Sequence, residues 1–112
     1  MNNSHIETMK EYVIMSTYIL LTKLSPGMMS DASTRESLGR EWMQTVKEKC
    51  PKVKWIEHYA LLGSYDFMDI YEAPDEEEAA KVSIITMMQG AVKAESMTAI
   101  PYKRYLELIK KL

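Results

Sequence analysis

The apolar positions of this chain divide it into short segments that alternate between strand and helix character. From Tyr12 to Leu24, β-branched and aromatic residues occupy both sets of alternating positions, which is typical of a strand covered on both faces. Turn residues at positions 25–27 end this segment. Leu38, Trp42 and Val46 then recur at four-residue intervals, and this spacing predicts an amphipathic helix.

A β-hairpin is predicted in the middle of the chain. Strand character returns from Val53 to Leu62 and resumes from Phe67 to Ala73, with the compact turn Gly63–Asp66 between the two segments. A loop of these four residues alone would place three pairs opposite each other: Leu62 and Phe67, Ala60 and Asp69, and His58 and Tyr71.

The second half of the chain repeats the helix and strand pattern. Asp75, with Glu78 three residues later, resembles a capping box and predicts the start of a second helix, which Gly90 should end. The alternation from Val92 to Ile100 predicts a last strand. A terminal helix should follow, with an apolar stripe formed by Tyr105, Leu108, Ile109 and Leu112.

The predicted order β, α, β, β, α, β indicates an α+β fold. Such an order makes a ferredoxin-like split β-α-β sandwich, in which a four-stranded antiparallel sheet carries both helices on one face. The uncovered face should then be apolar, because we expect it to include Tyr18, Leu20, Ala60, Leu62 and Phe67. Burying a few hundred square ångströms of that surface at about 25 cal/mol per Å² favours a homodimer, or a higher oligomer, with facing sheets.

Composition and charge restrict the kinds of partner. A chain of 112 residues is expected to form one domain over residues 12–112, preceded by an N-terminal arm at 1–11. The net charge of −2 argues against nucleic acid. The segment 12–24 is too short to span a bilayer, so no membrane partner is expected. The single cysteine, Cys50, indicates a reducing compartment and hence the cytoplasm.

Three stretches of the chain resemble the GYD domain family. The hairpin reads LLGSYDFMDIYEAPDEEEAAK, with the Gly-x-Tyr-Asp turn that marks the family; YILLTKLSPG is similar to its first strand and AVKAESMTAIPYKRY to its last. The resemblance implies a ferredoxin-like domain that pairs through its sheet as a dimeric α/β barrel, without a settled activity. Effector domains of the leucine-responsive transcription regulators also carry this turn, and they bind small molecules between subunits.

The Gly-x-Tyr-Asp turn is the strongest local signal for a site. Gly63 can supply a positive φ, Asp66 can accept backbone N–H groups, and Tyr65 can cover the end of the sheet. These roles are structural. The functional alternative is that Tyr65 and Asp66 line a ligand pocket between subunits.

A second candidate site is a polar cluster on the hairpin. His58, Asp69 and Tyr71 are expected to point into the interior of the dimeric barrel, joined by Tyr18 from the neighbouring strand. A histidine beside a carboxylate can act as a general base, with a tyrosine positioning a substrate oxygen. The alternative is a hydrogen-bonded polar group satisfied inside the dimer.

No cofactor or metal is expected from the sequence. His58 has no Cys or His partner at ligand spacing, and Cys50 lies at a helix end that disfavours a reactive thiolate. Three functions remain: a homo-oligomeric small-molecule-binding or regulatory module, a small cofactor-independent oxygenase or isomerase, and a structural assembly unit.

Overall fold

The structure, a computed structural model, describes residues 14–28 and 31–112. The predicted arm at 1–11 and the predicted strand start at Tyr12 lie outside these residues. The elements are β1 (Ser16–Leu24), η1 (Pro26–Met28), α2 (Ala32–Lys49), β2 (Lys54–Ala60), β3 (Phe67–Ala73), α3 (Glu76–Met88), β4 (Ala91–Ala99) and α4 (Tyr102–Lys110). Their types and order agree with the prediction, although β1 begins four residues later than expected.

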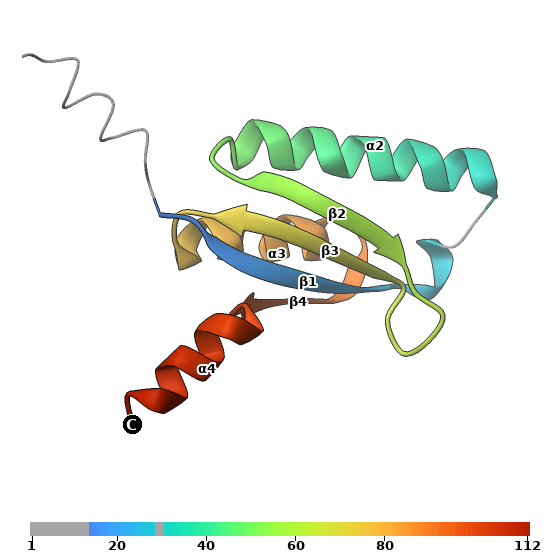
Figure 1. Ribbon diagram of the computed structural model, residues 1–112. Helices are drawn as coiled ribbons and strands as arrows, with labels where there is room; N and C mark the ends of the chain where they lie inside the picture. The colour runs from blue at the N-terminus through green and yellow to red at the C-terminus, as the bar shows by residue number, and fades with distance from the viewer. Residues whose placement is uncertain (1–13, 29–30) are drawn as a thin grey trace, which may run out of the picture.

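The four strands form one antiparallel sheet in the order β2-β3-β1-β4. Helices α2 and α3 connect the strands of the two β-α-β halves and contact each other (Figure 1). This strand order, with both helices on one side, is the ferredoxin-like arrangement that the sequence predicted.

Aspartates begin both helices. The side chain of Asp31 accepts the backbone N–H of Thr34 at 2.9 Å, and the side chain of Asp75 accepts that of Glu78 at 2.9 Å. Each bond satisfies one of the donors that a helix N-terminus leaves free. The expected start of α3 at Asp75 is therefore confirmed.

The hairpin register differs from the prediction by two residues. The loop between Ala60 and Phe67 is six residues long, and within it the N–H of Leu61 donates to the carbonyl of Asp66 at 2.9 Å. His58 consequently faces Asp69, and Trp55 faces Tyr71. From Glu57 to Ala60 the shift of two residues keeps each side chain on its expected face, so His58 and Asp69 still share a side. The register shifts again between Trp55 and Glu57, which places Trp55 on the same side as Tyr71.

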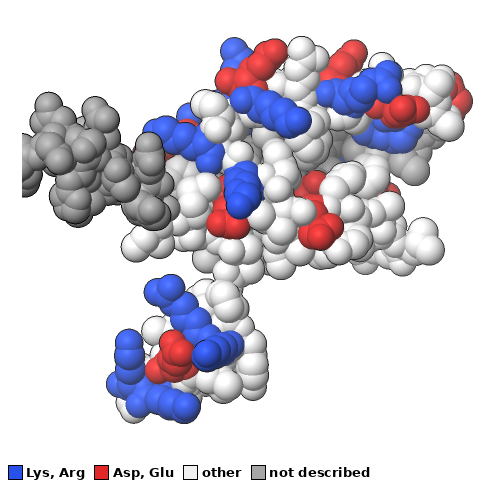
Figure 2. Space-filling view, turned by 45° about the horizontal axis from the view of Figure 1, so that its top comes forward, with Lys and Arg blue, Asp and Glu red and all other residues white. Residues whose placement is uncertain are grey.

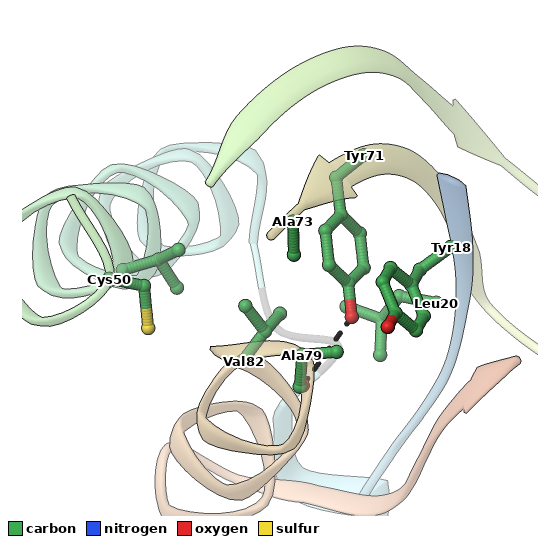
Figure 3. Close-up of a cluster of buried hydrophobic side chains, with 8 residues drawn as sticks. Tyr18, Leu20, Cys50, Tyr71, Ala73, Ala79 and Val82 are labelled. Atoms are coloured by element: carbon green, nitrogen blue, oxygen red, sulfur yellow. Dashed lines mark hydrogen bonds between the residues drawn. The ribbon is translucent and has the colours of Figure 1, made fainter. Parts of the chain in front are cut away.

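The core lies between the sheet and helices α2 and α3 (Figure 3). Tyr18 and Leu20 from β1 are buried there, and Tyr71 from β3 stacks on Tyr18 with ring centroids 5.5 Å apart. The prediction that Tyr18 and Leu20 lie on the uncovered face is wrong. Ala60 and Phe67 pair on the same helix side, and Leu62 lies in the hairpin loop.

The opposite residues of each strand form the uncovered face. Ile19 pairs with Ile70 on one side and with Met97 on the other, and Leu21 pairs with Met68. Both sets of alternating residues in β1 are thus apolar, so the sequence of this strand does not tell which set faces the helices. An apolar uncovered face is present, but its residues are not those expected.

Helix α4 stands apart from the rest of the molecule (Figure 1). Every residue from 100 to 112 is exposed, including the predicted apolar stripe. Figure 2 shows this helix as a separate lobe that carries several basic side chains. Within residues 14–28 and 31–112, no helix has the length and apolar character needed to cross a membrane.

Candidate functional site

A cavity of about 650 Å³ lies between α2 and the helix side of the sheet. We call it the α2 cavity. Its wall is mostly apolar, with Leu24 from β1, Leu38, Trp42 and Met43 from α2, and Phe67 from β3. A concave apolar site with a few polar groups is typical of small-molecule binding.

His58 and Asp69 supply polar groups to this cavity. They lie opposite each other on β2 and β3, and the Nδ1 atom of His58 is 2.5 Å from Oδ1 of Asp69. The Asp69 side chain is only 2% exposed, whereas that of His58 is 55% exposed. The buried Asp69 therefore fixes the imidazole ring through Nδ1, while His58 remains accessible from the cavity.

The surroundings of His58 favour its protonated form. Its pKa is raised mainly by the hydrogen bond to Asp69, and the negative charge of Asp69 adds to this effect. Partial burial and the positive charge of Arg35 act in the opposite direction. Among residues 14–28 and 31–112, no protein group bonds to Nε2 of His58, so this atom is available to a ligand.

Aromatic rings hold the imidazole in place. The Phe67 ring stacks against His58 with centroids 5.6 Å apart, and the Trp42 ring lies 6.4 Å away. The indole N–H of Trp42 donates to Thr86 Oγ1 on α3 at 2.9 Å, which fixes the orientation of the ring. Trp42 thus links α2 to α3 while it lines the cavity.

The Gly-x-Tyr-Asp turn lies outside the α2 cavity. Asp66 accepts the backbone N–H of Leu24 through Oδ2 at 2.7 Å, and the Tyr65 hydroxyl donates to Glu95 at 2.9 Å. Gly63 lies in the loop, but its φ is not positive; the positive φ of 110° belongs to Gly90. These contacts join the loop to β1 and β4 and give Tyr65 and Asp66 structural roles in this chain.

Tyr71 and Tyr18 belong to the core rather than to the cavity. The Tyr71 hydroxyl lies 2.8 Å from Ser96 Oγ, and burial raises the pKa of Tyr71 to about 12. Figure 3 shows the same hydroxyl directed at α3, where it reaches the carbonyl of Ala79. Tyr71 is therefore not placed to position a substrate in the α2 cavity.

Sequence reasoning did not identify Arg35, Gly39 and Trp42 as residues of the site. Trp42 was expected only as part of the apolar stripe of the helix, and Arg35 carried no recognisable signal. A glycine inside a predicted helix was the one available clue, since glycine is unfavourable there.

In the described part of the chain, no three His, Cys, Asp or Glu side chains form a group that could hold a metal ion. The thiol of Cys50 is buried in the core, and its pKa is raised first by burial and then by the charge of Glu78. Both effects disfavour the reactive thiolate.

The family model of the GYD domain matches residues 18–109. The chain belongs to the GYD domain family. A Thermus thermophilus protein named "Glutamine synthetase and cystathionine beta-lyase binding protein" is 27% identical over 99 residues, which cover 86% of this chain and 100% of that protein. The GYD match confirms the resemblance seen in the sequence.

Two solved structures are similar to this GYD-domain chain. The first is a DABB family protein with a ferredoxin-like fold from Mesorhizobium loti, with a TM-score of 0.48 and 12% identity. The alignment covers 78% of this chain and 96% of that protein. The second is a protein of unknown function from Rhodopseudomonas palustris, with a TM-score of 0.45 and 15% identity. The alignment covers 90% of this chain and 94% of that protein.

Proposed function

We propose that this GYD-domain protein is a homodimeric binding module that takes a small organic molecule into the α2 cavity. The observation that carries the proposal is the accessible His58 at the wall of a cavity of about 650 Å³, held from below by buried Asp69. Such a group can recognise one polar atom of a ligand whose remainder contacts Trp42 and Phe67. The site lies within one chain, not between the facing sheets as the sequence had suggested.

Gly39 supports a binding role for the cavity. It lies inside α2, where glycine destabilises a helix by about 0.5–1 kcal/mol relative to alanine. A Cβ at this position would approach only the Arg35 side chain, at 3.9 Å, and the φ of Gly39 is not positive. The fold gives no reason for glycine here, whereas the missing side chain leaves space in the cavity.

The homodimer is proposed from the uncovered face. Ile19, Ile70 and Met97 form a cross-strand row on this face, and Leu21 and Met68 form a second one. Contiguous apolar surface of this kind marks interaction sites in proteins. Two sheets that faced each other would remove both rows from water.

The related Thermus thermophilus protein, by its name, binds two enzymes. That name supports a binding role for this chain as well, in preference to a catalytic one.

Mass spectrometry of freshly purified protein tests the proposal. We expect wild-type protein to release a bound small molecule, or to gain thermal stability from compounds of a metabolite library. Gly39→Leu, which fills the cavity, should lose both properties. Gly63→Leu is the matched control, because Gly63 lies in an open part of the hairpin loop. Equal ligand release and equal thermal stabilisation in the two variants would contradict a site in the α2 cavity. The remaining function would then be that of a structural assembly unit.

The contact between His58 and Asp69 also favours a second candidate, a cofactor-independent oxygenase or isomerase. Asp69 fixes Nδ1 and leaves Nε2 able to exchange a proton with a substrate. If this protein is an enzyme, His58→Ala should abolish turnover of the identified ligand while thermal stabilisation by that ligand persists. Unchanged ligand after incubation with wild-type protein would exclude this candidate.

A further inference from the structure

The α2 cavity contains a positive charge that has no acidic partner in the described part of the chain. Arg40 pairs with Glu36 at 3.0 Å, and His58 pairs with Asp69. No carboxylate among residues 14–28 and 31–112 lies within salt-bridge distance of Arg35, although Arg35 lines the same cavity. Among the described residues, its guanidinium group makes one hydrogen bond, a long one of 3.4 Å to the carbonyl of Met28.

Arg35 and His58 share the ring of Phe67. The guanidinium carbon of Arg35 lies 5.4 Å from the ring centroid, and the His58 ring lies 5.6 Å from it. The aromatic ring attracts the cation and restricts its position. Both groups are thus fixed beside Phe67 in a cavity whose wall is mostly apolar.

Gly39 gives the guanidinium group its space. An Nη atom of Arg35 lies 3.9 Å from the position of a Cβ at Gly39, one turn further along α2. A larger side chain at this position would extend into the volume beside the guanidinium group. The glycine therefore leaves both the cavity and the cation accessible.

We propose that the ligand of the α2 cavity is an amphiphilic organic anion, whose single carboxylate or similar group binds Arg35 and whose apolar body contacts Trp42, Leu38 and Met43. This inference rests on the proposed function and names its ligand class. Arg35 is suited to the task because guanidinium binds planar anions through two parallel hydrogen bonds. The Nε2 atom of His58, which no described residue bonds, supplies a second polar contact in the same cavity.

Two fluorescent probes with the same aromatic skeleton test the charge preference. Anilinonaphthalene sulfonate is an anion, and phenylnaphthylamine lacks the sulfonate group. We expect wild-type protein to bind the anion about tenfold or more tightly than the neutral probe, as a charge-assisted hydrogen bond allows. Binding that survives in Gly39→Leu occurs on outer surfaces and is subtracted.

Arg35→Met should remove the preference for the anion and leave the affinity for the neutral probe within about twofold. Lys47→Met is the control, because it removes the same charge from an exposed position of the same helix. Equal cavity affinities of the two probes, or equal effects of the two substitutions, would overturn the inference on anions while the binding function stands. If neither Gly39→Leu nor Leu38→Trp changes any affinity, both proposals fall.

Discussion

The carboxylate of Asp66 accepts the backbone N–H of Leu24 at 2.7 Å, at the point where the register between β1 and β4 shifts. The backbone N–H of Asp66 donates in turn to the carbonyl of Thr22 at 2.8 Å. The aspartate of the Gly-x-Tyr-Asp turn thus replaces the hydrogen bond that a regular ladder would supply to β1. This contact explains why the turn lies against the first strand.

Asp66→Ala should lower the free energy of unfolding by about 1–3 kcal/mol, because it leaves the N–H of Leu24 without its partner. Urea denaturation followed by circular dichroism measures the change. Ser64→Ala, in the same loop but exposed, should change stability by less than about 0.5 kcal/mol. A similar loss in both variants would show that the loop, rather than this hydrogen bond, sets the effect.

Gly39→Ala should raise the free energy of unfolding by about 0.5–1 kcal/mol, because it improves helix propensity where the added methyl group meets no backbone. Chemical denaturation again provides the measurement. Gly90→Ala should act in the opposite direction, since Gly90 has a φ of 110° and a Cβ there would lie 2.6 Å from the Met28 side chain. A destabilised Gly39→Ala protein would contradict the argument that glycine is retained for the cavity.

The pKa of His58 should lie above its ordinary value of 6.5, because Asp69 stabilises the imidazolium. The stabilisation from this pair is then complete below pH 6.5 and is lost as the pH rises through the higher folded-state pKa. An NMR titration of the imidazole signals should show the raised value. Asp69→Asn should lower it, since only partial burial and Arg35 would remain to act on the ring.

Ile19→Lys should convert a dimer into a monomer at micromolar concentration, because Ile19 occupies the middle of the apolar row on the uncovered face. Size-exclusion chromatography with light scattering reports the molecular mass. Ile84→Lys is the control, since Ile84 is exposed on α3, an element of the other side of the sheet. An unchanged mass for Ile19→Lys would contradict pairing through the sheet.

The element order was predictable from the sequence because each signal was local. Asp75 with Glu78 predicted the start of α3, and the alternation near Val92 predicted β4. The register of the hairpin was not predictable in this way. It depends on the bond from Leu61 to Asp66 within the loop, which no residue pattern reveals.

The sequence pattern also does not show which face of each strand packs against the helices. Tyr18 and Leu20 are as apolar as Ile19 and Leu21, so only packing against the helices decides which pair is buried. His58 and Asp69 were assigned to the open face because the predicted hairpin pairing places them on the same side as Ala60 and Leu62. The sequence predicted that the two side chains belong to one polar cluster. The position of this cluster in the α2 cavity depends on tertiary structure.

Helix α4 has nine residues and stands clear of the sheet. Isolated helices shorter than about 12–15 residues are marginal in water, so intramolecular bonds alone do not keep this segment wound. Every residue of α4 is exposed, so contacts with the described part of the chain do not add to its stability. Residues 102–110 should therefore take up deuterium rapidly while the sheet remains protected, and slow uptake there would show that another molecule covers the apolar stripe.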